Sequence, residues 1–192
     1  LNVMRTVQEL ETAGVCAASI EDTDLPQPFG SVGTPRMLSI EESVGKMKAA
    51  IEGRQDPKFV IAGRTSACTI SNVDDCIARV KAYEAAGVDM IFLAGVKSHD
   101  DIEAVATEVN IPMIIGGGPA ADLDRYAELG VRIALQGHKP IMAAVRAVYD
   151  TLKALRDGTP HGDIEYFANA DMMKQVTRGG DYDRWMREYL ND

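Results

Sequence analysis

The chain has 192 residues, of which 46% are hydrophobic and 26% charged, as expected of a globular protein with a sizeable core. Its net charge of −9 argues against a nucleic-acid partner, which would be bound through its phosphates, and no apolar run is long enough for a membrane span. The three cysteines, Cys16, Cys68 and Cys76, show neither a disulfide framework nor zinc-site spacing. We therefore expect a reduced, cytoplasmic protein with no membrane partner.

Apolar periodicity predicts helices and strands that alternate along the chain. The expected strands are the apolar runs at 17–20, 59–62, 90–93, 111–115 and 131–135. Residues suited to helix N-termini are expected to begin most of the intervening helices: Ser39, Asn72, Ser98, Asp122 and Pro140. Strict alternation of this kind implies parallel strands joined by right-handed crossovers.

Two architectures fit this alternation, the (β/α)8 barrel and the doubly wound open sheet. The open sheet usually carries a glycine-rich nucleotide-binding turn, and neither G-x-G-x-x-G nor G-x-x-x-x-G-K occurs here. Reactive groups instead follow successive strands, at Glu21, Arg64, Lys97 and His138, which favours a barrel. A barrel needs eight strands, so either the strand count is too low or the chain begins inside the barrel.

The segments I-E-D-T (20–23) and R-T-S-A (64–67), followed by the strand end Q-G-H (136–138), resemble the isocitrate lyase/phosphoenolpyruvate mutase superfamily. The closest similarity is to its oxaloacetate decarboxylase branch. The resemblance implies a TIM-type (β/α)8 barrel whose fourth to eighth strands lie within 1–158, followed by a helical extension at 159–192. The first three βα units, with the Asp that binds the metal directly, would then precede Leu1.

The resemblance also implies roles for three side chains. Arg64 would grip a substrate carboxylate with its planar guanidinium, although an Arg at a strand end can instead anchor a neighbouring loop carboxylate. His138 would contact the substrate, the alternative being an ordinary loop histidine. Glu21 would accept hydrogen bonds from metal-bound water. A structural salt bridge is the alternative for Glu21 and for the adjacent Asp22, whose role stays open.

The implied activity is Mg²⁺-dependent decarboxylation of oxaloacetate, or a close 2-oxo diacid, to pyruvate and CO2 through a metal-stabilised enolate. Mn²⁺ is the alternative ion, and a homotetramer with a swapped helix is the implied assembly. The loop Gln27–Ser31 lacks the cysteine and histidine of the lyase loop K-[KR]-C-G-H and is expected to act as a mobile lid. The alternative functions are a C–C bond lyase on a substituted malate, a phosphonopyruvate hydrolase and a non-catalytic barrel fragment.

Three other features carry further expectations. The run Gly116–Gly118 suits either a phosphate cradle or a flexible turn. His99 is expected at the surface. A C-terminal apolar stripe is expected to dock on the barrel or on a neighbouring subunit, and it consists of Tyr182, Trp185, Met186 and Tyr189.

Overall fold

A computed structural model describes residues 1–26, 29–30, 33, 35–116 and 123–190. Contacts divide the chain into two compact units, Leu1–Gly137 and His138–Asp192. Within the described residues, no helix combines the length and the apolar character that crossing a membrane requires.

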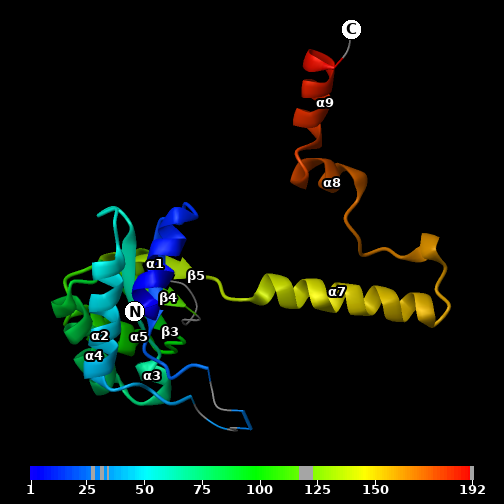
Figure 1. Ribbon diagram of the computed structural model, residues 1–192. Helices are drawn as coiled ribbons and strands as arrows, with labels where there is room; N and C mark the ends of the chain where they lie inside the picture. The colour runs from blue at the N-terminus through cyan, green and yellow to red at the C-terminus, as the bar shows by residue number, and fades with distance from the viewer. Residues whose placement is uncertain (27–28, 31–32, 34, 117–122, 191–192) are drawn as a thin grey trace. The chain divides into compact units, whose positions relative to one another are not determined.

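The first unit is built on a five-stranded parallel sheet in the order β1-β2-β3-β4-β5 (Figure 1). Its strands are β1 (Ala17–Glu21), β2 (Val60–Thr65), β3 (Met90–Ala94), β4 (Met113–Gly116) and β5 (Val131–Leu135). Every strand lies beside the strand that follows it in sequence, whereas a doubly wound sheet reverses its order at a switch point. The sequential order is therefore that of a barrel segment.

Helices pack on one face of this sheet. They are α1 (Asn2–Thr12), α2 (Ile40–Gly53), α3 (Ala67–Ile70), α4 (Val73–Ala86), α5 (His99–Ala106) and α6 (Leu123–Glu128). The predicted caps Ser39, Asn72 and Ser98 each accept a hydrogen bond from the backbone N–H three residues later. Asp122, the fourth predicted cap, lies outside the described residues.

Alternation along the strands separates the core from the inner face of the sheet. Ile61, Ile91 and Leu93 are buried against the helices, while Arg64 and Phe92 are half-buried on the opposite face. The prediction that the second strand ends at residue 62 was wrong, because pairing with β1 continues as far as Glu21 and Arg64. Arg64 is consequently held by strand hydrogen bonding and does not lie in a loop.

The second unit consists of α7 (Lys139–Arg156), the short 3₁₀ helix η1 (His161–Asp163), α8 (Ala170–Val176) and α9 (Gly179–Tyr189). Contacts group α7 with the C-terminal residues, so this division lies between Gly137 and His138. The predicted division of the chain into 1–158 and 159–192 stays a prediction. Within α9, the rings of Tyr182 and Trp185 meet edge to face at 5.4 Å between centroids. The docking of this stripe on another surface also stays a prediction.

Candidate functional site

Glu21 and Arg64 lie side by side where β1 and β2 end. They are register partners in the parallel ladder, and Nη1 of Arg64 lies 3.3 Å from Oε2 of Glu21. About a third of the Arg64 side chain and a quarter of the Glu21 side chain remain exposed (33% and 26%), so this ion pair contributes at most about 1 kcal/mol to stability. Its main effect is to orient the guanidinium. The ion pair is the structural alternative considered for both residues, and it leaves other donors of Arg64 available.

On its other side, Arg64 faces Phe92 of β3, which is its register partner there. The guanidinium carbon lies 5.3 Å from the centroid of the Phe92 ring, within the range of a cation–π contact. Nε of Arg64 is buried and has no hydrogen-bond partner among the described residues. A buried donor without a partner is costly, whereas the exposed third of the Arg64 side chain can still meet an anionic ligand.

A second cation, Lys46 of α2, reaches the same strand end. Its ammonium group donates a hydrogen bond to the backbone carbonyl of Glu21. Sequence reasoning identified neither Lys46 nor Phe92 as part of the site. Strand alternation places Phe92 on one of two faces, but only the register brings it beside Arg64. The spacing of Lys46 does not distinguish it from other lysines on a helix surface.

Asp22 faces the helices, away from Glu21 and Arg64. Its carboxylate is fully buried and accepts hydrogen bonds from Tyr83 Oη at 2.6 Å and from Arg79 Nη1 at 3.3 Å. Arg79 also donates to Asp75 at 3.0 Å. Burial, assisted by the bond to Asp22, raises the pKa of Tyr83 above its usual range. Oδ2 of Asp22 thus makes the structural contacts of the second alternative, and the role of this residue stays a prediction.

The chain that follows Asp22 leaves the sheet and returns beside its own start. Thr23 and Met37 form an antiparallel bridge. The backbone N–H of Asp24 donates to the carbonyl of Arg36 at 2.8 Å, and the side chains of this pair also form an ion pair. Of the predicted lid Gln27–Ser31, only Phe29 and Gly30 are among the described residues, so lid closure stays a prediction.

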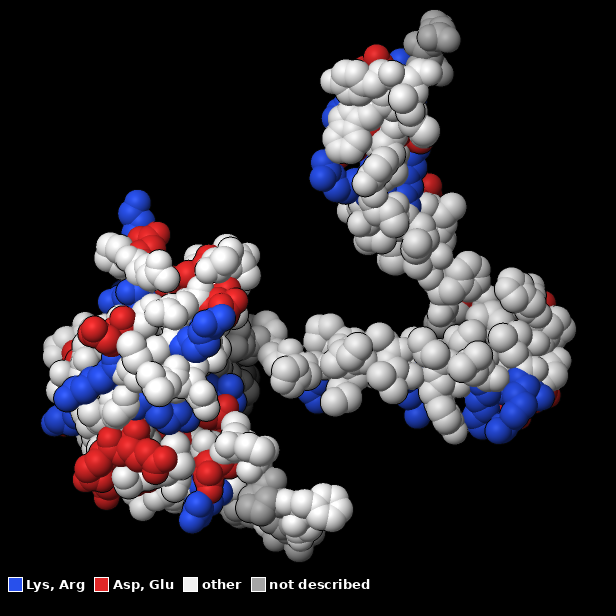
Figure 2. All heavy atoms as spheres, in the orientation of Figure 1, with Lys and Arg blue, Asp and Glu red and all other residues white. Residues whose placement is uncertain are grey.

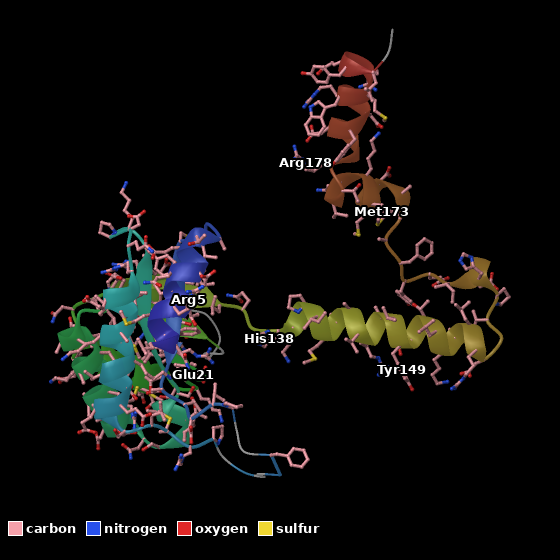
Figure 3. All side chains as sticks on the ribbon, viewed as in Figure 1. Arg5, Glu21, His138, Tyr149, Met173 and Arg178 are labelled. Carbon is pink, nitrogen blue, oxygen red and sulfur yellow. The ribbon has the colours of Figure 1, made fainter. Side chains whose placement is uncertain are left out.

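His138 is the N-cap residue of α7, where its carbonyl accepts a hydrogen bond from the N–H of Met142 at 3.2 Å. It belongs to the second unit, whereas Glu21 belongs to the first, and Figure 3 labels both residues. Of the three predicted site residues, the structure brings Glu21 and Arg64 together. The approach of His138 to Arg64 remains a prediction.

Few of the described side chains could coordinate a divalent ion or the water bound to it. The described part of the chain contains no cluster of three or more His, Cys, Asp or Glu side chains that could hold a metal. Glu21 nevertheless fits a role toward a hydrated ion, because it is a partly exposed carboxylate and Mg²⁺ usually keeps several waters. Asp22 does not fit, because it is buried on the helix side and engaged by Tyr83 and Arg79.

The structure also bears on His99 and on the glycine run at 116–118. His99, expected at the surface, is half-buried, and its ring centroid lies 5.5 Å from that of Tyr126. Gly116 ends β4, and the other two glycines of its run, Gly117 and Gly118, lie outside the described residues.

Comparisons with known proteins show what this chain is similar to. A family model described as phosphoenolpyruvate phosphomutase matches residues 1–156. Oxaloacetate decarboxylase of Bradyrhizobium sp. (strain ORS 278) is 47% identical over 192 residues, which cover 99% of this chain and 66% of that protein. The chain thus spans slightly less than two thirds of the length of this relative.

Solved structures show the same fold. The phosphoenolpyruvate phosphomutase from Streptomyces platensis subsp. rosaceus has a TM-score of 0.81 at 21% identity, over 99% of this chain and 69% of that one. Phosphonopyruvate hydrolase in complex with oxalate and Mg²⁺ has a TM-score of 0.75 at 26% identity, over 99% of this chain and 68% of that one. These matches confirm the predicted resemblance and the barrel fold class.

Proposed function

We propose, from the premise that this chain belongs to the phosphoenolpyruvate phosphomutase family, that it acts as a carboxy-lyase that converts oxaloacetate, or a close 2-oxo diacid, to pyruvate and CO2. The relative that is 47% identical and named oxaloacetate decarboxylase supports this choice of substrate. The observation that carries the proposal is the Arg64 guanidinium, which pairs with Glu21, lies against the Phe92 ring and keeps about a third of its side chain (33%) exposed at the strand end.

Arg64 would bind one carboxylate of the substrate. Charge-assisted hydrogen bonds from a guanidinium are strong and directional, and a partly buried setting strengthens them further. Phe92 provides an apolar wall on one side of the guanidinium, and Ile133 of β5 belongs to the same inner face of the sheet. Arg64 would therefore fix the orientation of the 2-oxo acid, and the apolar wall would limit the contact of the bound acid with water.

Decarboxylation breaks the bond between C3 and C4 of oxaloacetate, and its electron pair passes into the C2–C3 bond to give an enolate. A proton taken up at C3 then yields pyruvate. We propose that the imidazole of His138 positions the keto oxygen or the second carboxylate during this step. Support comes from its place at the N-terminus of α7, directly after the Q-G-H strand end.

The proposed cofactor is Mg²⁺, with Mn²⁺ as the alternative ion. When bound, the ion supplies Lewis acidity for the negative charge that develops on the keto oxygen. Glu21 would accept hydrogen bonds from water on the ion, and the same carboxylate holds Arg64 in place. A structure of phosphonopyruvate hydrolase with oxalate and Mg²⁺ supports the choice of ion.

A homotetramer in which subunits exchange α7 is the proposed assembly. The apolar stripe of α7 is exposed at every position and follows helical spacing, as expected of a face that packs on another chain: Ile141, Val145, Val148, Leu152 and Leu155. Figure 2 shows mainly uncharged atoms on the visible face of this helix. The free thiols of Cys16, Cys68 and Cys76 support a reducing, cytoplasmic setting.

The competing activity is phosphonopyruvate hydrolysis, which the 26% identity to the hydrolase structure favours. The purified chain would be incubated with oxaloacetate, phosphonopyruvate or a substituted malate, with Mg²⁺ or Mn²⁺, and pyruvate release would be followed. Divalent ions alone decarboxylate oxaloacetate slowly, so an Arg64→Ala variant at the same metal concentration provides the control. We expect metal-dependent turnover of oxaloacetate well above that control.

Turnover of phosphonopyruvate without turnover of oxaloacetate would replace the proposed reaction with the hydrolase. A C–C lyase would instead consume the malate. If no substrate is consumed and calorimetry detects no binding of oxalate with Mg²⁺, the non-catalytic interpretation holds.

A further inference from the structure

Phe92 has no part in the reaction proposed above beyond forming a wall, yet its surroundings are specific. It is the register partner of Arg64 on one side and of Ile114 on the other, and it lies on the inner face of the sheet. The ring is therefore set between the cationic strand end of β2 and the carboxyl end of β4.

A glycine makes room for this ring. A Cβ atom added to Gly116 would lie 3.0 Å from Cε2 and 3.3 Å from Cζ of Phe92. Contacts this short are tighter than nine in ten real Cβ contacts, so the ring would have to shift by a few tenths of an ångström. The Phe92 ring thus packs directly against the space that Gly116 leaves free, and a side chain at residue 116 would shift it slightly.

The ring and the Glu21 carboxylate hold Arg64 from opposite neighbouring strands. Nη1 lies 3.3 Å from Glu21, and the guanidinium carbon lies 5.3 Å from the ring centroid. A free arginine side chain samples many rotamers, and holding it in one arrangement lowers the entropy cost of binding a ligand. The ring occupies one side of the guanidinium without using any of its N–H donors.

We propose that Phe92, seated over Gly116, is the positioning residue that holds the Arg64 guanidinium ready for the substrate carboxylate. This inference rests on the proposed function for the identity of that substrate. The aromatic face of residue 92 and the lack of a side chain at residue 116 are its two structural requirements.

Phe92→Leu keeps an apolar side chain and removes the π face. Because the contact is present before and after the chemical step, its loss should raise KM for oxaloacetate about 2- to 30-fold while kcat changes little. Phe92→Tyr keeps the ring and should retain a KM close to that of the wild type. Gly116→Ala displaces the ring and should raise KM in the same direction. The double variant Phe92→Leu/Gly116→Ala should show less than the product of the two single effects, because both changes disrupt one contact.

A matched control separates positioning from general stability. Phe59 is a buried phenylalanine just before β2, and Phe59→Leu should lower Tm without changing KM. A second readout does not depend on turnover: the Nε–H NMR resonance of Arg64 should be displaced by the ring current of Phe92. It should return toward the ordinary arginine position in Phe92→Leu and stay displaced in Phe92→Tyr.

The outcomes distinguish the two proposals. If the wild-type chain does not turn over oxaloacetate, the proposed function fails, while the Arg64 resonance still tests the contact. If the wild type is active and Phe92→Leu and Gly116→Ala lower Tm with an unchanged KM, the positioning role of Phe92 is overturned. An Arg64 resonance that is the same in wild type and Phe92→Leu would overturn it as well.

Discussion

Tyr83 Oη donates a 2.6 Å hydrogen bond to Oδ2 of Asp22, and this bond fastens α4 to the end of β1. Both side chains are fully buried. The preceding residue, Glu21, points to the opposite face of the sheet and pairs with Arg64. Two consecutive carboxylates therefore have different tasks, because adjacent side chains at a strand end point to opposite faces.

Removing the Tyr83 hydroxyl should destabilise the first unit. In Tyr83→Phe the buried Oδ2 of Asp22 loses its shortest hydrogen bond, and leaving such an acceptor poorly satisfied costs about 1–3 kcal/mol. Urea denaturation would measure the free energy of unfolding, with Tyr149→Phe as the control because that tyrosine is exposed. Equal stability of Tyr83→Phe and wild type would show that the bond contributes nothing.

Because of Tyr83, we expect the protein to become less stable at alkaline pH. Burial, and then the bond to Asp22, raises the pKa of Tyr83 in the folded state above its unfolded value of about 10. The neutral Tyr83 hydroxyl makes its full contribution to the free energy of unfolding below pH ~10. This contribution is lost as the pH rises toward the pKa of Tyr83 in the folded state, because the tyrosine of the unfolded chain releases its proton first. The free energy of unfolding should fall more steeply above pH ~10 for wild type than for Tyr83→Phe. Parallel pH profiles of the two proteins would contradict this cause.

Replacing Arg64 with lysine should impair the proposed reaction. Arg64→Lys keeps the positive charge but loses the planar fork and its stacking on Phe92, so kcat/KM for oxaloacetate should fall about 10- to 100-fold. Steady-state assays would compare it with Arg5→Lys, which changes an exposed arginine of α1. Near-normal turnover by Arg64→Lys would count against carboxylate binding at this position.

Neutralising Glu21 should weaken the response to the divalent ion. Glu21→Gln keeps the size of the side chain but is a poorer acceptor for metal-bound water, so half-maximal activity should require about 10- to 100-fold more Mg²⁺. Activity would be titrated with Mg²⁺ beside Glu9→Gln, a control on an exposed carboxylate. An unchanged Mg²⁺ requirement would remove Glu21 from the proposed metal environment and leave it only its ion pair with Arg64.

A charge within the apolar stripe of α7 should break the proposed assembly. Val148→Asp would bury an unpaired carboxylate in any interface that this stripe forms, so the tetramer should dissociate. Light scattering after size-exclusion chromatography would measure the mass, with Arg146→Asp on the polar side as the control. A tetramer that survives Val148→Asp would show that another surface holds the subunits together.

The sequence alone established the local elements and the family resemblance. Ser39, Asn72 and Ser98 were identified as caps because the side chain and the amide it binds are only three residues apart. The resemblance also predicted Glu21 and Arg64 as site residues, since each lies in a distinctive motif at a strand end, and the structure pairs the two side chains. Family motifs and helix caps are contiguous in sequence and can therefore be recognised without knowledge of the fold.

Only the tertiary structure decided what surrounds these residues. The partners of Asp22 and Arg64 come from other strands and helices: Tyr83 reaches Asp22 from α4, and Phe92 reaches Arg64 from β3. The space that Gly116 leaves for the Phe92 ring likewise depends on two strands. Strand alternation offers two faces for each side chain, and the choice is set by the register between strands and by helix packing, which are relations between distant segments.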